Sequence, residues 1–208
     1  MKNLILLASG LIFSIALQGQ GQAEVQSSVN KMFIGGGAGF NSSTEKDSED
    51  KYSQWNFGPS FVYMLNDKVG LGISFIVNGS TSNYSNDTYE AEYKSSGWMA
   101  EPFVRYYFAG IGKVKFFGDA FINFGGGKDE FSDNFTSSDE SKYGNFGIGV
   151  RPGFQFWFND NWSMASTIGN LGYSSLTDNK GDSDETKTNN FGVNVDFSTV
   201  NFSFYWHF

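Results

Sequence analysis

Six charged or amide side chains interrupt segments that are otherwise apolar, and they are the clearest candidates for chemistry. They are Glu101, Arg105, Lys115, Asp119, Arg151 and Gln155, each flanked by apolar or small residues. Because a buried charge without a partner is costly, we expect the two acidic residues to pair with the two arginines in a hydrogen-bonded ionic network. Interior packing is the simplest use of such a network, and a proton-linked gate or small polar conduit is the alternative.

The chain offers little for catalysis or metal binding. It has no Cys, which excludes thiol nucleophiles and cysteine zinc sites, and its one His is His207. Serines are plentiful, but they lie mainly in polar breaks, where they favour solvation. The segment Asp178–Glu185 lacks the full register of a calcium loop, and Gly35–Gly39 is not followed by the Lys-Ser/Thr pair of a phosphate loop. We therefore predict no enzymatic activity, no metal site and no cofactor, with close backbone packing at the glycines.

The composition favours strands over helices. Aromatic residues make up 18% of the 208 residues, Gly numbers 26, and five of the nine Leu lie in the first seventeen positions. Strong helix formers are scarce where β-formers and turn residues abound, which predicts an all-β chain. The net charge of -8 argues against nucleic acid as a partner, because phosphate binding needs clustered Lys and Arg.

Eight stretches of alternating apolar residues are separated by breaks rich in Ser, Asn, Asp and Gly. The stretches span 32–40, 51–65, 69–80, 89–108, 114–126, 142–158, 162–176 and 190–208. Tight breaks at 66–68, 109–113 and 159–161 alternate with long ones, so short turns gather at one end and long loops at the other. An even number of strands with both termini on the short-turn side is the plan of a bacterial outer-membrane barrel.

The long breaks concentrate the negative charge. Windows 41–51, 81–92, 128–142 and 177–188 together hold 16 of the 22 acidic residues. We interpret these windows as solvated mobile loops. The alternative is that divalent cations bridge their carboxylates to the phosphates of lipopolysaccharide.

The sense of the alternation separates a membrane barrel, which displays its apolar face, from a soluble one, which hides it. In 142–158 one face is continuously apolar, while the other combines Gly with Arg151 and Gln155. This pattern predicts an outward apolar face and a filled polar interior. A soluble ligand-binding barrel would require the apolar faces to point inward.

Three local features of the strands depart from regular alternation. A Pro in a strand removes a ladder donor, so we expect bulges at Pro59, Pro102 and Pro152. The apolar residues of the last stretch change phase near Ser198, which predicts a further bulge. The alternation in 162–176 does not decide which of its faces points outward.

The first residues resemble an export signal. Lys2 precedes an apolar run from Leu4 to Leu17, and the triplet Gly21-Gln22-Ala23 has small residues at the two positions that signal peptidase inspects. The run is shorter than the roughly 20 residues that a membrane-spanning helix needs. We predict a cleaved secretory signal peptide at 1–23 and a barrel domain at 24–208.

The chain ends on alternating hydrophobic residues with an aromatic at the last position. Phe204, Trp206 and Phe208 share one face of this segment. This ending, with the signal peptide and the eight-strand plan, resembles the small OmpA/OmpX-like outer-membrane β-barrel family of Gram-negative bacteria. The resemblance implies an eight-stranded antiparallel up-and-down transmembrane β-barrel in the cell outer membrane. It also implies that the three aromatic residues are an assembly signal for the barrel-assembly machinery.

The expected partners are outer-membrane lipid and lipopolysaccharide, the barrel-assembly machinery and an unidentified extracellular partner, with the barrel itself a monomer. The expected role is structural, adhesive or one of surface interaction through the long acidic external loops. A narrow porin-like channel for small polar solutes is the alternative. Membrane-barrel enzymes act at the outer rim, whereas His207 lies near the opposite end, and this again argues against turnover.

Overall fold

A single antiparallel sheet contains all the strands that the structure describes. The computed structural model describes residues 31–44, 50–85, 89–135, 139–194 and 202–208. The predicted signal peptide therefore lies outside the described residues. The strand segments are β1 (Met32–Thr44), β2 (Lys51–Met64), β3 (Val69–Ser85), β4 (Glu90–Ile111), β5 (Val114–Asp133), β6 (Asp139–Trp157), β7 (Trp162–Thr167), β8 (Asn170–Asp178), β9 (Thr186–Asn194) and β10 (Phe202–His207).

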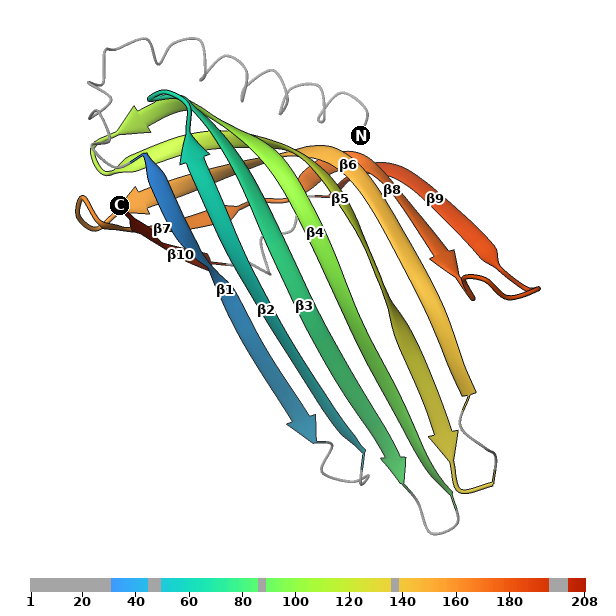
Figure 1. The fold of residues 1–208 in the computed structure, drawn as a ribbon. Coiled ribbons are helices and arrows are strands. Elements are labelled where there is room, and N and C mark those ends of the chain that lie inside the picture. The colour runs from blue at the N-terminus through green and yellow to red at the C-terminus, as the bar shows by residue number, and fades with distance from the viewer. Residues whose placement is uncertain (1–30, 45–49, 86–88, 136–138, 195–201) are drawn as a thin grey trace, which may run out of the picture.

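The sheet closes on itself, which confirms the predicted eight-stranded antiparallel barrel. Strands β1 to β6 pair in chain order, and β6 pairs with both β7 and β8, which together occupy the place of one strand. In the same way, β9 pairs with β8, and β10 pairs with β7. The first strand then pairs with β10 through Phe33–Gly36, which closes the barrel. In Figure 1, β7 and β10 lie at the end where the chain finishes, and the β8–β9 hairpin runs away from them.

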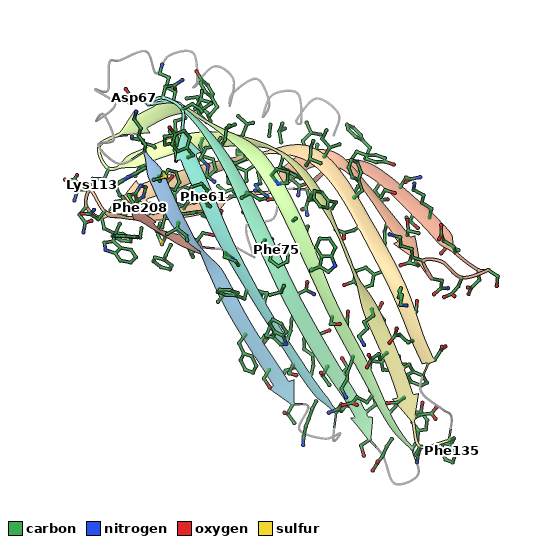
Figure 2. The ribbon with its side chains drawn as sticks, in the orientation of Figure 1. Phe61, Asp67, Phe75, Lys113, Phe135 and Phe208 are labelled. Carbon is green, nitrogen blue, oxygen red and sulfur yellow. The ribbon has the colours of Figure 1, made fainter. Side chains whose placement is uncertain are left out.

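The two ends of the barrel differ as predicted. Figure 2 shows Asp67, Lys113 and Phe208 at the short-turn end and Phe135 at the opposite end. In the β2–β3 turn the Asn66 side-chain oxygen accepts hydrogen bonds from two backbone N–H groups of the turn, each at 2.9 Å. Asn159 makes the same pair of bonds in the turn before β7. These Asn side chains accept hydrogen bonds from turn N–H groups that have no partner strand where the chain reverses.

Apolar side chains point outward and the polar network points inward. On β2, Phe61 and Tyr63 are 37% and 41% exposed, whereas Val62 between them is fully buried. A soluble barrel would show the opposite sense, and this structure excludes that alternative. Among the described residues, no helix is long and apolar enough to cross a membrane.

The strands continue well beyond the predicted ends at the long-loop side. Strand β3 reaches Ser85, β5 reaches Asp133, and β6 begins at Asp139. Much of the sequence predicted as long mobile loops is therefore paired strand, and that prediction was wrong for windows 81–92 and 128–142. The pairing persists because Ser, Thr, Tyr and Phe fill these windows beside the charges, and such residues suit a sheet. The wall of the barrel thus rises above its apolar band.

The predicted proline bulges are absent at Pro59 and Pro102, whereas the wall is bulged opposite Pro152. Pro59 pairs with Gly36, and Pro102 pairs with Ile73, without a shift of register. The missing N–H interrupts pairing on one side only, toward β3 for the first and toward β5 for the second. A register shift between β4 and β5 lies at Tyr107 and Ala109. Another lies opposite Pro152, where three residues between β7 and β8 face two residues of β6.

The ambiguous seventh stretch changes phase in its middle. In β7 the odd-numbered Ser163 and Ala165 pair with inward residues of β6, whereas in β8 the odd-numbered Tyr173 pairs with the outward Ile148. The change occurs at Gly169, whose φ of 65° is a left-handed conformation that suits glycine. Pro152 faces this irregular junction. The bulge predicted near Ser198 lies outside the described residues.

Candidate functional site

A buried ion pair occupies the interior between β4 and β5. The Arg105 guanidinium donates two hydrogen bonds to the Asp119 carboxylate, from Nε at 2.8 Å and from Nη2 at 2.9 Å. The two residues are 3% and 1% exposed. They are directly opposite each other in the register, which presents the planar guanidinium to both carboxylate oxygens. Charges at this depth are tolerable because each neutralises the other.

A second arginine joins the pair to another carboxylate. Arg151 on β6 donates from Nη2 to Glu101 Oε1 at 2.5 Å, and its Nε lies 3.6 Å from Asp119 Oδ2. Asn123 also donates to Glu101, at 3.5 Å. The structure therefore brings together the two acidic residues and the two arginines of the sequence-based set. They form one network across three adjacent strands.

Polar contacts continue from this network toward the short-turn end. The Tyr107 hydroxyl donates to Gln155 Oε1, and Gln155 Nε2 donates to Ser163 Oγ at 2.6 Å. Ser163 Oγ in turn lies 2.6 Å from His207 Nε2. Since the serine oxygen accepts from Gln155, its hydroxyl is placed to donate to the imidazole. The contacts thus run from β4 through β6 and β7 to β10.

The Ser163 and His207 pair has the atoms of a nucleophile and a base, but a substrate has no access to it in this structure. Ser163 is fully buried, and His207 is 2% exposed. The Phe33 ring lies against the imidazole at a centroid distance of 4.6 Å. The arrangement therefore packs the interior.

Lys115, the remaining charged candidate of the sequence analysis, lies apart from the ionic network. Its ammonium nitrogen lies 4.7 Å from the centroid of the Trp157 ring and 5.8 Å from that of Tyr107. No ion pair joins it to any other described residue. The residue lies next to the turn of β4 and β5, near the barrel end, and aromatic faces stabilise its charge there.

The interior is more aromatic than the sequence pattern indicates. Arg105 stacks over the Phe117 ring at 3.7 Å from its centroid, and Arg151 lies 4.8 Å from that of Phe121. The inward glycines make room for these rings, since a Cβ at Gly153 would overlap the Phe117 ring. Sequence analysis took these glycines as part of a polar interior. Gly72, Gly149 and Gly153 instead leave the space that a neighbouring Phe ring fills, whereas Gly147 makes room for the Asn123 amide.

Sequence analysis missed Ser163 as a member of the interior. The residue lies in the stretch whose phase changes, so its period-2 pattern is broken. A shorter window would have revealed it, because β7 taken by itself alternates regularly. The small residues at 163 and 165 lie on the face opposite Trp162 and Met164, which indicates that they point inward.

The C-terminal strand completes the wall beside this interior. Phe204, Trp206 and Phe208 are 54%, 44% and 42% exposed on the outer face, and the last two rings stack at 4.9 Å. The Phe208 backbone N–H donates to the Met32 carbonyl at 2.9 Å. The predicted assembly signal is thus outward and accessible, next to the seam between β1 and β10.

The sequence of this filled, outwardly apolar barrel matches a known protein family. Residues 5–198 match the outer membrane protein β-barrel domain family. The chain belongs to this family. The protein is accordingly a bacterial outer-membrane β-barrel, as the sequence predicts. Since such barrels have short periplasmic turns and longer extracellular loops, the tall wall lies outside the cell.

Solved outer-membrane proteins resemble this barrel at low sequence identity. OprG from Pseudomonas aeruginosa is 14% identical with a TM-score of 0.49, and the match covers 88% of this chain and 98% of OprG. Ail from Yersinia pestis is 14% identical with a TM-score of 0.41, over 85% of this chain and 95% of Ail. A major outer membrane protein from Thermus thermophilus is 12% identical with a TM-score of 0.42, over 86% and 100%. No curated protein sequence matches this outer-membrane barrel.

The network predicts energetic coupling between Glu101 and Arg151. Glu101→Ala and Arg151→Ala should each lower the free energy of unfolding of the detergent-folded barrel. The double variant should lose less than the sum, by about 0.5–3 kcal/mol, because the two residues share one hydrogen bond. Urea titrations of the four proteins measure this difference. Additive losses would show that the pair contributes no interaction energy.

The terminal ring predicts an assembly defect that leaves the folded seam intact. Phe208→Ala keeps the backbone bonds to Met32 but removes the exposed aromatic group. We expect a several-fold drop in the amount of heat-modifiable barrel in outer-membrane fractions, while Phe208→Trp should restore it. The same variant refolded from urea into detergent should behave normally. Equal membrane yields for Phe208→Ala and the unchanged protein would argue against an assembly signal.

Proposed function

We propose that this outer-membrane barrel works through its external end as a surface-contact protein, and that its interior is closed to solutes. The supporting observation is the buried network of Arg105, Asp119 and Gln155, whose exposed fractions are 3% or less. A water-filled conduit would leave such side chains hydrated. The ionic contacts instead satisfy one another across the interior, which weighs against the alternative of a porin-like channel.

The outer face just beyond the apolar band supports contact with lipopolysaccharide. Each of three neighbouring strands carries one lysine and one glutamate there, at Glu92, Lys94, Lys128, Glu130, Glu140 and Lys142. The Lys128 ammonium bonds to two of the glutamates, which raises the pKa of Lys128 and lowers that of Glu130. Both groups therefore stay charged at neutral pH, as contact with lipid phosphates and their bridging cations requires.

A binding assay on whole cells tests the proposed surface role. Cells that display the barrel are compared with cells that display a variant whose external connections at 45–49, 86–88, 136–138 and 179–185 are replaced by Gly-Ser-Asn turns. Heat-modifiable mobility confirms that both barrels are folded in the outer membrane. The probes are immobilised panels of purified proteins and glycans.

The expected result is attachment to at least one panel member by the unchanged barrel and a weaker attachment by the loop-replaced one. The acidic composition of these connections favours basic or neutral probes. If the two cell types attach equally to every probe, the external connections have no role in contact and the proposal fails.

A further inference from the structure

A regular grid of eight side chains faces inward on the part of the wall that rises above the apolar band. Its first row runs Ser82, Tyr93, Phe131, Asp139 across β3 to β6, and its second row runs Ser80, Ser95, Asp129, Ser141 across the same strands. These residues share the face of Glu101 and Asp119, because no register shift intervenes. Strand spacing makes the grid about 15 Å wide and about 7 Å high. An aromatic row thus lies beside a row of hydroxyls and a carboxylate.

The grid lines a pocket at the external mouth of the barrel. The pocket has a volume of about 240 Å³ and includes all eight of these side chains. That volume is below the roughly 300–1,000 Å³ of sites for drug-sized ligands, so it suits a single small ring. Glu101 lies six residues below Ser95 on β4, which puts the ionic network about 20 Å away. The pocket is therefore separate from the network.

The centre of the pocket is an aromatic platform made by Tyr93, which is exposed, and Phe131, which is partly buried. Their rings are tilted by 42° with centroids 4.6 Å apart, and Tyr84 packs edge-on against Tyr93. Tyr84 and Tyr93 are 47% and 50% exposed. Outward aromatic residues of the band are covered by lipid, but these face inward at the mouth, and the described part of the chain leaves about half of each of these two tyrosines uncovered. Exposed apolar surface in such a position marks a binding site.

The polar groups around the platform are free to bind. No hydrogen bond or ion pair joins the carboxylates of Asp129 and Asp139 to another described residue. The same holds for the hydroxyls of Ser82 and Ser95 within the described part of the chain. The pocket therefore offers two acceptor-only groups and two groups that both donate and accept, arranged around the two aromatic rings.

We propose that this pocket binds one pyranose ring of an external, uncharged or amino-bearing saccharide. A sugar ring has an apolar C–H face that covers the Tyr93 and Phe131 platform, and hydroxyls at its rim that donate to the carboxylates of Asp129 and Asp139. A simple cation would not use the serine hydroxyls, and an anionic sugar would be repelled by the carboxylates. This inference rests on the proposed surface role and names a ligand class for it.

Saturation-transfer NMR on the full detergent-folded chain, in preparations free of lipopolysaccharide, tests the pocket. The probes are glucose, galactose, mannose, N-acetylglucosamine and glucosamine, with choline as a cation that lacks a hydroxyl-rich ring. We expect at least one pyranose to show transfer to its C–H protons. Tyr93→Ala, Phe131→Ala and Asp129→Asn should each weaken that binding at least tenfold. Phe135→Ala is the matched control, because it removes an exposed ring at the same end that does not line the pocket.

Each other outcome overturns a defined part of the inference. Absence of transfer to every pyranose, from barrel shown to be folded by heat-modifiable mobility, overturns saccharide binding. Transfer to choline alone makes the pocket a cation site, and sugar binding unchanged in Tyr93→Ala places it elsewhere. Displacement by purified lipopolysaccharide would assign the pocket to the membrane's own sugars and not to an external glycan. Attachment of cells to the protein panels would persist in Tyr93→Ala, so failure here leaves the surface role standing.

Discussion

Replacing Asp119 with alanine is expected to lower the free energy of unfolding by about 3–5 kcal/mol, the cost of leaving a buried partner charge uncompensated. Arg105 donates two hydrogen bonds to Asp119 and is itself 3% exposed, so its guanidinium cannot reach water without opening the barrel. Urea titration of the detergent-folded protein, followed by heat-modifiable gel mobility, measures the loss.

Two further variants show whether the loss comes from the orphaned charge. Asp67→Ala removes an exposed carboxylate from the β2–β3 turn and should change the unfolding free energy by less than about 0.5 kcal/mol. Arg105→Met combined with Asp119→Leu removes both charges and should recover most of the stability. If Asp119→Ala is no more destabilising than Asp67→Ala, the buried pair is not a structural element of the barrel.

Gly35→Ala is expected to disrupt the seam that closes the barrel. A Cβ at Gly35 would overlap the Phe204 carbonyl oxygen and stand 2.7 Å from the Tyr205 Cα, and both are backbone atoms of β10. The strands must separate to admit a methyl group, which costs about 3 kcal/mol, the upper end for overpacking. We expect a lower urea midpoint and a loss of the heat-modifiable form.

The matched control for the seam is Gly118→Ala. Gly118 is also a strand glycine, but no atom lies within 4 Å of the Cβ that it would acquire. Alanine is a better strand residue than glycine, so this variant should keep or slightly raise the urea midpoint. Equal midpoints for the two variants would contradict the close approach of β1 and β10.

The facing of the strands could be predicted from sequence because period 2 is strict wherever one face meets lipid. Phe61 and Tyr63 alternate with buried Val62, and the sequence pattern already separates them. The facing of β7 and β8 could not be predicted, because the outward residues change from even-numbered to odd-numbered at Gly169. The alternation has opposite phase in the two halves of this stretch, so neither face is consistently apolar over its whole length.

The sequence predicted the ion pairs of the interior but not its aromatic packing. Pairing of buried opposite charges follows from the cost of leaving them alone, and this reasoning brought Arg105 and Asp119 together. The aromatic packing depends on which ring enters the space above each glycine, and this is a matter of cross-strand register that residue types alone do not determine. The contact of Lys115 with Trp157 could not be predicted for the same reason, since it depends on how the neighbouring rings are arranged.

The height of the external wall was also beyond the sequence pattern. Serine and acidic residues between 81 and 92 indicate a loop by composition, yet they pair as strand up to Ser85 and again from Glu90. Side-chain pairs between neighbouring strands stabilise these strand ends, and the β-propensities of individual residues do not take such pairs into account. The aromatic pocket exists only because this pairing continues.

Single-channel recording tests most directly whether the barrel is closed. Purified protein, shown to be folded by heat-modifiable mobility, is inserted into planar bilayers at neutral pH in potassium chloride. The buried network predicts no discrete current steps from the unchanged barrel. Regular conductance steps that disappear when the barrel is unfolded would contradict a closed interior and would make the protein a channel.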